Sequence, residues 1–231
     1  MTIKADFPGF SKETFEFLSD LERNNSREWF QERRDLYDEY VLDPSQRFVV
    51  DMGERLKTIS PKVVANPKID KSIFRIYRDT RFSADKTPYK THVGIFFWEG
   101  GRKKLGNSGY YLQLNKSSIF IGGGIYGLPK DMLKTFRDSV VDGKKGRELQ
   151  KILEEIQDNK SYKVGGEHYK RLPSGYDPEH PNARLLLHNG LYAYTESALP
   201  DEIYSSGFVD YCFGIFRDLS PLHEWLVKIV R

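Results

Sequence analysis

The clearest indication of the fold class comes from residues 109–121, Gly-Tyr-Tyr-Leu-Gln-Leu-Asn-Lys-Ser-Ser-Ile-Phe-Ile. Its first half alternates, so that apolar side chains share one face of an extended chain: Tyr110, Leu112 and Leu114. A polar corner at residues 116–117 leads into a second extended run at 118–121. Two such runs joined by a short corner predict a β-hairpin, and therefore antiparallel pairing.

Further strands are predicted before this hairpin. Residues 72–77 form one, and residues 92–98 form another that is rich in Val, Ile, Phe and Trp. Directly after the hairpin, Gly122–Gly124 break the strand pattern. A bend in the sheet or the close packing of a helix is the favoured explanation, because these glycines lack the spacing of a phosphate-binding loop.

A second hairpin is predicted later in the chain. Residues 185–188 and 191–195 flank Asn189-Gly190. Asn-Gly is the preferred pair for a type I′ turn, because both residues tolerate positive φ.

Helices are predicted toward both ends of the chain. Ser11 can cap a first helix, and Asn25 with Glu28 has the spacing of a capping box for the next. Pro44 suits the first turn of a third helix. Residues 222–230 carry apolar side chains at helical spacing, which predicts a C-terminal helix.

Helices that flank clustered strands predict an α+β fold. We expect a mostly antiparallel sheet, with an N-terminal helical region at 11–60 and a C-terminal helix packed on the sheet. The part that contains the sheet would span 70–231. The 231 residues suit a single domain over 1–231.

The composition excludes several classes of protein. Charged residues make up 30% of the chain and nearly balance, with a net charge of +3. A single cysteine, Cys212, cannot form an internal disulfide, and its apolar surroundings favour a buried filler. No signal peptide and no membrane-spanning run is evident, which predicts a cytoplasmic protein without a membrane partner. The five histidines lack metal-ligand spacing, so no metal site is assigned, and the cofactor and oligomeric state stay open.

The chemical signal lies in residues 71–92, KSIFRIYRDTRFSADKTPYKTH, hereafter the basic segment. It holds six Lys and Arg against two Asp, whereas the rest of the chain holds 30 basic and 31 acidic residues. Arginine presents a planar fork of donors that matches phosphate or carboxylate. The candidate ligand-binding residues here are Arg75, Arg78, Arg81, Lys86, Tyr89 and Lys90.

The two acids of the segment are the candidate catalytic residues. Asp79 would orient an arginine or act as a general base, and Asp85 belongs to the same constellation. A second polar loop, at residues 170–180, would fold over the first. It would add Lys170, Arg171 and Tyr176 to the site.

Three functions remain open at this point. The first is binding, with or without turnover, of an anionic small molecule that bears phosphate or carboxylate. The second is a nucleic-acid-binding module, since basic residues interleaved with aromatics suit backbone contacts and stacking. The third is an interaction or scaffold protein in which the motif is a structural salt-bridge network.

The run from Arg75 to Lys90 resembles the family called domain of unknown function 2461, found in bacteria and fungi. Its hallmark is Arg-x-x-Arg-Asp-x-Arg-Phe followed by Asp-Lys and Tyr, and each of these residue types stands here in order. Other similar stretches are 25–30, 109–113, 122–126 and 170–176. The resemblance implies a stand-alone protein of the bacterial type with these residues as its signature. It supplies no activity.

Overall fold

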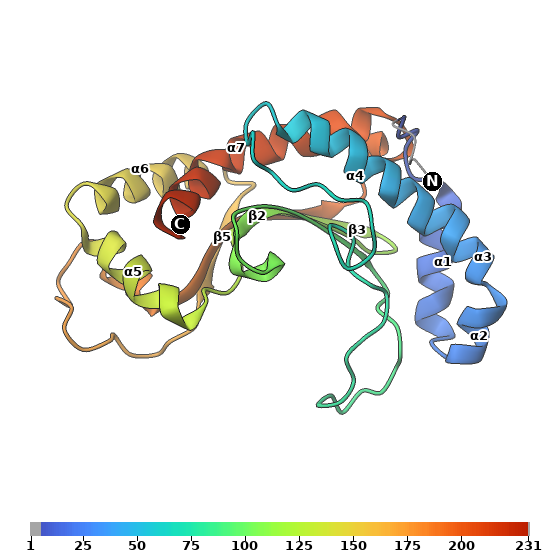
Figure 1. Cartoon of the computed structure of the whole chain (residues 1–231), viewed down its shortest axis with the longest axis horizontal. Coiled ribbons are helices and arrows are strands. Elements are labelled where there is room, and N and C mark those ends of the chain that lie inside the picture. Colours follow the sequence, from blue (N-terminus) through green and yellow to red (C-terminus); the bar gives the residue numbers. More distant parts are fainter. Residues whose placement is uncertain (1–5, 231) are drawn as a thin grey trace. The chain divides into compact units, whose positions relative to one another are not determined.

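In the computed structural model, which describes residues 6–230, five strands form one antiparallel sheet (Figure 1). The strand order is β1-β2-β3-β5-β4. The strands are β1 (Val93–Glu99), β2 (Ser108–Leu114), β3 (Ser118–Ile125), β4 (Lys163–Glu167) and β5 (His188–Ala198). Helices precede and follow the sheet, so the predicted α+β class is confirmed.

The backbone contacts divide the chain into two compact units. Unit 1 contains the residues up to Phe97 together with 111–120 and 196–214. Unit 2 contains 98–110, 121–195 and the residues from Ile215 onward.

Unit 1 is built from helices that are rich in aromatic side chains and that pack on extended segments of the chain. Its helices are α1 (Lys12–Arg23), α2 (Arg27–Glu32), α3 (Arg34–Tyr37), the π-helical turn η1 (Asp38–Leu42), α4 (Asp43–Leu56), the 3-10 turn η4 (Asp201–Tyr204) and the start of α7 (Gly207–Val230). Rings of Phe10, Phe48 and Phe208 contact one another with centroids 5.5–6.3 Å apart. Such edge and tilted contacts between buried rings stabilise a core beyond the area they bury.

The predicted capping box at Asn25 and Glu28 is wrong by one residue. Ser26 caps α2, and its hydroxyl accepts a hydrogen bond from the Trp29 N–H (3.2 Å). The Asn25 side chain instead bonds the backbone of Tyr89. Because a serine stands next to it, the helix does not need the asparagine as a cap.

Unit 2 packs three helices around an aliphatic and aromatic core. They are α5 (Lys130–Val141), α6 (Lys145–Asp158) and the C-terminal part of α7, with 3-10 turns η2 (Lys104–Gly106) and η3 (Ala183–Leu187). The Trp225 indole is buried and donates to the Lys145 carbonyl (3.0 Å), which joins α7 to α6. Gly123 lets Leu219 of α7 approach β3, since a Cβ there would lie 3.1 Å from the leucine Cβ. The close helix packing predicted for these glycines is therefore present.

Two expectations at glycine are wrong, namely the break in the strand pattern at Gly122–Gly124 and the type I′ turn at Asn189-Gly190. β3 continues through Gly122–Gly124 to Ile125, and β5 runs straight through Asn189-Gly190 without a hairpin. At Gly124 φ is +133°, and a Cβ would lie 2.4 Å from the Leu191 carbonyl oxygen. At Gly190 a Cβ would lie 2.2 Å from the Tyr126 carbonyl oxygen. These glycines serve close backbone approach rather than reversal of the chain.

A buried histidine marks the core of unit 2. His223 of α7 is 1% exposed, and its Nδ1 lies 2.9 Å from the Ser108 hydroxyl. Its Nε2 has no hydrogen-bond partner in residues 6–230 and lies 4.0 Å from a carboxylate oxygen of Glu99. Burial lowers the pKa of this imidazole from 6.5 to about 4, so the ring is neutral at pH 7.

We expect the free energy of unfolding to fall as the pH drops from 7 toward 4. The unfolded chain takes up a proton on His223 near pH 6.5, whereas the folded chain takes it up only near pH 4. The loss from this one group amounts to about 3 kcal/mol at pH 4. Urea unfolding at several pH values measures it.

The variant His223→Asn should lose much of this dependence, because its amide oxygen can still accept from Ser108 but does not titrate. His168→Asn, at an exposed position, is the control. An unchanged slope of stability against pH in His223→Asn would contradict the assignment.

Candidate functional site

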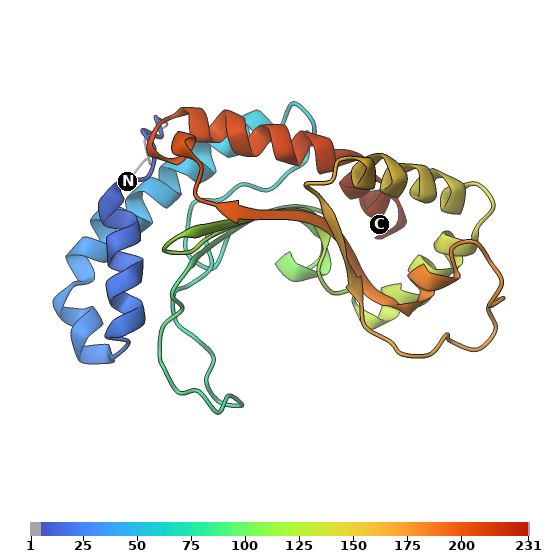
Figure 2. The ribbon, with the colours of Figure 1, turned by 180° about the vertical axis from the view of Figure 1, so that it is seen from behind.

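The basic segment is extended, but it does not form the continuous strand predicted at 72–77. Its first part bonds to β1, since Phe74 N–H donates to the Gly94 carbonyl (2.9 Å). Its next part bonds to residues 88–90 instead, with Arg78 N–H donating to the Pro88 carbonyl (2.8 Å). Because the chain changes partners midway, only isolated bridges form. Residues 79–87 are left as a loop that projects away from the helices of unit 1 (Figures 1 and 2).

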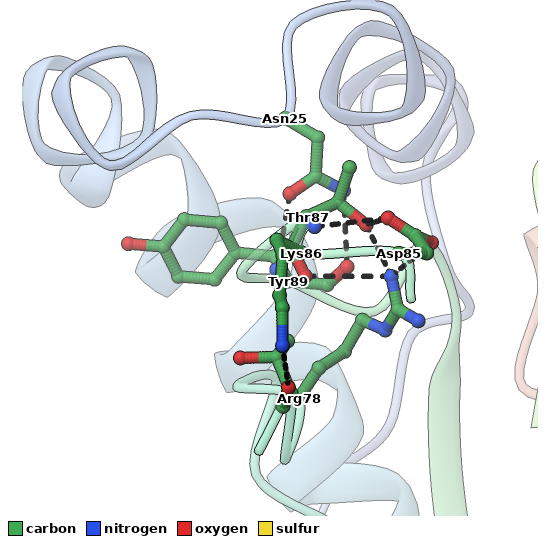
Figure 3. Close-up of polar contacts among 7 residues, drawn as sticks. Asn25, Arg78, Asp85, Lys86, Thr87 and Tyr89 are labelled. Atoms are coloured by element: carbon green, nitrogen blue, oxygen red, sulfur yellow. Dashed lines mark hydrogen bonds and ion pairs between the residues drawn. The ribbon is translucent and has the colours of Figure 1, made fainter. Parts of the chain in front are cut away.

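The base of this loop is anchored in the core of unit 1 at Tyr89. The Tyr89 ring is 1% exposed and stacks on Phe30, with centroids 4.2 Å apart and planes at 22°. The Asn25 amide donates to the Tyr89 carbonyl and accepts from its N–H, both at 3.0 Å (Figure 3). The ring predicted to contact a ligand thus packs against a phenylalanine and holds the segment in place.

The Arg78 side chain connects the two ends of the loop. Its guanidinium donates to a carboxylate oxygen of Asp85 and to the hydroxyl and carbonyl of Thr87 (Figure 3). Asp85 also accepts from the N–H and hydroxyl of Thr87, at 2.9 and 2.8 Å. These hydrogen bonds, first the Thr87 N–H and then Arg78, lower the Asp85 pKa to about 2. The cluster ties both ends of the loop together.

The second arginine of the loop is paired as well. Arg81 Nε and Nη2 lie 2.9 and 2.7 Å from the two oxygens of Asp79, and this pairing lowers the Asp79 pKa to about 2. The pair is exposed, so it adds little stability. Phe82 beside it is 95% exposed, with the Arg81 guanidinium 5.8 Å from its ring centroid. Carboxylates with pKa values this low are ionised at pH 7 and make weak general bases.

The remaining cations of the candidate site have no carboxylate within ion-pair distance among residues 6–230. The Lys86 ammonium donates to the Thr80 carbonyl, and the Lys90 ammonium to the Arg75 carbonyl, each at 2.9 Å. Arg75 itself is exposed. Burial, and then the neighbouring charge of Arg75, lowers the pKa of Lys90. Of these three cations, Arg75 and Lys90 are close enough for their charges to interact, and neither has an ion pair within residues 6–230.

Aromatic side chains adjoin these two cations. The Lys90 ammonium lies 5.5 Å from the centroid of the Phe74 ring, which packs edge-on to Tyr111 at 6.1 Å. The Tyr111 hydroxyl donates to the Gln113 side chain (2.9 Å), and burial raises its pKa to about 12. This part of unit 1 thus offers positive charge next to ring faces.

The second predicted loop belongs to unit 2, whereas the basic segment belongs to unit 1. Its Tyr176 hydroxyl donates to Asp138 of α5 (2.8 Å), and its Leu172 packs against the core. Lys170 and Arg171, which directly precede Leu172 in this loop, are exposed. Tyr176 therefore fastens the loop to a helix of its own unit.

Sequence reasoning missed a row of tyrosines in unit 2. Tyr192 and Tyr194 alternate along β5, and their ring centroids are 5.8 Å apart. Tyr126 is 82% exposed, and its ring centroid lies 5.6 Å from that of Tyr192. Tyr192 lies across Gly165 of β4, where a Cβ would be 2.6 Å from the ring. The two-residue spacing of Tyr192 and Tyr194 in β5 could have indicated this row from the sequence alone. The prediction of an Asn-Gly turn just before them led instead to a hairpin.

Other chemistries find less support. Within residues 6–230, no group of three or more His, Cys, Asp or Glu could hold a metal ion. Cys212 is fully buried, and burial raises the pKa of its thiol, which disfavours the reactive thiolate. In the same residues, no helix has both the length and the apolar character needed to cross a membrane.

These features define an α+β protein with a basic loop braced by its own carboxylates. A family model described as conserved hypothetical protein (DUF2461) matches residues 13–225, and the chain belongs to this family. A search of the curated proteins found no match.

We expect Asn25→Ala to destabilise the protein by about 2 kcal/mol, because two backbone groups of buried Tyr89 lose their partner. Urea unfolding measures the change. The control is Asn24→Ala, which removes only an exposed hydrogen bond to the Asp20 carbonyl. Equal stability of the two variants would show that the Tyr89 anchor contributes nothing.

We expect Arg78→Ala to open the loop locally. Loss of the bonds to Asp85 and Thr87 removes about 1.4 kcal/mol of closing energy, which corresponds to a tenfold rise in the open population. Chymotrypsin cleavage after exposed Phe82, followed by mass spectrometry, reports that population. Arg75→Ala, which breaks no ion pair in the described chain, should cleave at the wild-type rate. Equal rates for both variants would refute the bracing role.

Proposed function

We propose that this protein binds an anionic small molecule bearing phosphate or carboxylate, held by Arg75 and Lys90. The observation that carries the proposal is that the Lys90 ammonium bonds the Arg75 backbone carbonyl at 2.9 Å and also feels the charge of the Arg75 side chain. Neither forms an ion pair with the residues described. Like charges placed together repel unless an anion lies between them.

The electrostatics of Lys90 support this assignment. Its pKa is lowered by burial and by Arg75, and the charge of Asp70 opposes that shift as the weakest of the three causes. A bound anion would offset both unfavourable effects, because it would supply the missing opposite charge. The guanidinium of Arg75 would offer two parallel donors, and the ammonium of Lys90 a point charge.

The neighbouring rings narrow the ligand class. Phe74 lies under the Lys90 ammonium, and Tyr111 packs on Phe74. A phosphate or carboxylate attached to a planar or apolar group would place its charge on the cations and its body against these rings. A nucleotide has this combination.

Within the proposal, Arg78 and Arg81 prepare the site rather than contact the anion. Each already pairs with a carboxylate of the same loop. These same pairs favour a second candidate function, an interaction or scaffold protein in which the segment is a structural network. The two functions make different predictions for Arg75 and Lys90.

The test compares Arg75→Gln/Lys90→Gln with the wild type in thermal unfolding. The ligands are inorganic phosphate, mononucleotides, citrate and a short single-stranded oligonucleotide. A ligand at 100 times its dissociation constant adds about 2.7 kcal/mol, which raises the midpoint by roughly 5–10 °C at this size. We expect a rise with one anionic class in the wild type and its loss in the double variant.

The control variant is Lys62→Gln, which removes an exposed charge of unit 1 outside the basic segment. It should respond as the wild type does. An equal response in the double variant would overturn the proposal. A flat wild-type panel would favour the scaffold function, and a response to the oligonucleotide alone that collapses with added salt would favour nucleic-acid binding.

A further inference from the structure

An arginine of unit 2 lacks a charge partner. Arg137 lies on α5 and is half-buried. Its Nε is buried and has no hydrogen-bond partner in residues 6–230, and the guanidinium forms no ion pair there. The Tyr169 ring is one close neighbour, with its centroid 5.0 Å from the guanidinium carbon, and the Arg137 charge also acts on the Tyr176 hydroxyl. A buried donor without a partner costs free energy, so an acceptor from outside the chain would stabilise it.

The two acids of the same helix are already occupied. Asp138, the next residue, accepts from the Lys134 ammonium (2.6 Å) and the Tyr176 hydroxyl (2.8 Å). Asp131, at the start of the same helix, pairs with Arg102 at 2.9 Å. Neither carboxylate is free to turn to Arg137 without losing its present partner.

The second polar loop forms the other side of this region. Tyr169 is fixed by its N–H, which donates to the Leu187 carbonyl (2.8 Å), and by the His168 ring packed edge-on at 4.9 Å. Tyr176 is fixed by Asp138, so both ends of the loop lie on α5 (Figure 1). Lys170 and Arg171 follow Tyr169 directly and are exposed. Two further cations therefore follow directly in the sequence after the tyrosine that packs against the Arg137 guanidinium.

We propose that Arg137 is the centre of an oxyanion-binding site between α5 and the loop at residues 169–176. The Tyr169 ring lies 5.0 Å from the guanidinium carbon, so a carboxylate or phosphate would approach from the side away from this ring and accept from the guanidinium N–H groups. Lys170 and Arg171 raise the local concentration of anions. This site lies in unit 2 and does not depend on Arg75 or Lys90.

The experiment observes the Arg137 side chain itself. In the Arg75→Gln/Lys90→Gln background, the ¹H–¹⁵N signal of each arginine Nε is recorded while inorganic phosphate, acetate or chloride is added at equal ionic strength. The Arg137 signal is the one absent from Arg137→Gln. We expect it to shift saturably with phosphate, acetate or both, which tells the two anion classes apart, and not with chloride. No saturable shift with either oxyanion would overturn the proposal.

Variants on the same helix supply the second readout. Arg137→Gln should raise the dissociation constant for the oxyanion at least tenfold, and Arg137→Lys, which keeps the charge but not the fork, should fall between. Lys130→Gln, an exposed charge on α5, should bind as the wild type does. In anion-free buffer Arg137→Gln should be at least as stable as the wild type, because an unpaired charge is removed. Marked destabilisation with unchanged anion affinity would assign Arg137 to the fold instead.

Discussion

The candidate site of unit 1 depends on the pairing between one side-chain amide and one backbone residue. Asn25 both donates to and accepts from Tyr89, which lies 64 positions later in the chain. Only an amide side chain offers a donor and an acceptor at this spacing. The pairing satisfies the backbone of a residue whose ring is buried on Phe30, and it therefore sets where the loop at 79–87 begins and ends.

Around this anchor the charges of the basic segment divide into two groups. Arg78 and Arg81 meet carboxylates of their own loop, which braces it and leaves both acids ionised. Arg75 and Lys90 lie where the segment runs beside β1, with ring faces next to them. A loop that neutralises its own arginines keeps a fixed shape, and under the proposed function Arg75 and Lys90 are then held in place before the anion binds. Preorganisation of this kind lowers the cost of binding.

In unit 2 the charges also divide into a paired group and a cation without an ion pair. Asp138 already accepts from Lys134 and Tyr176, and within residues 6–230 Arg137 has an aromatic ring beside it but no ion pair. In both units the neighbours of the spare cation are aromatic, which partly compensates a charge without neutralising it. An external oxyanion could therefore bind such a cation without first displacing a carboxylate of the protein.

Local sequence patterns were enough to predict the α+β class, the hairpin of β2 and β3, and helices such as α1 and α7, because these follow from periodicities between residues close in the chain. The roles of Asn25 and Gly190 follow from the folded chain alone, since a cap, a turn or a close approach depends on which distant backbone lies beside the residue. The same holds for charge. Composition identified the basic segment, but whether a given arginine is paired, as Arg78 is, or spare, as Arg137 is, depends on distances that the fold alone creates.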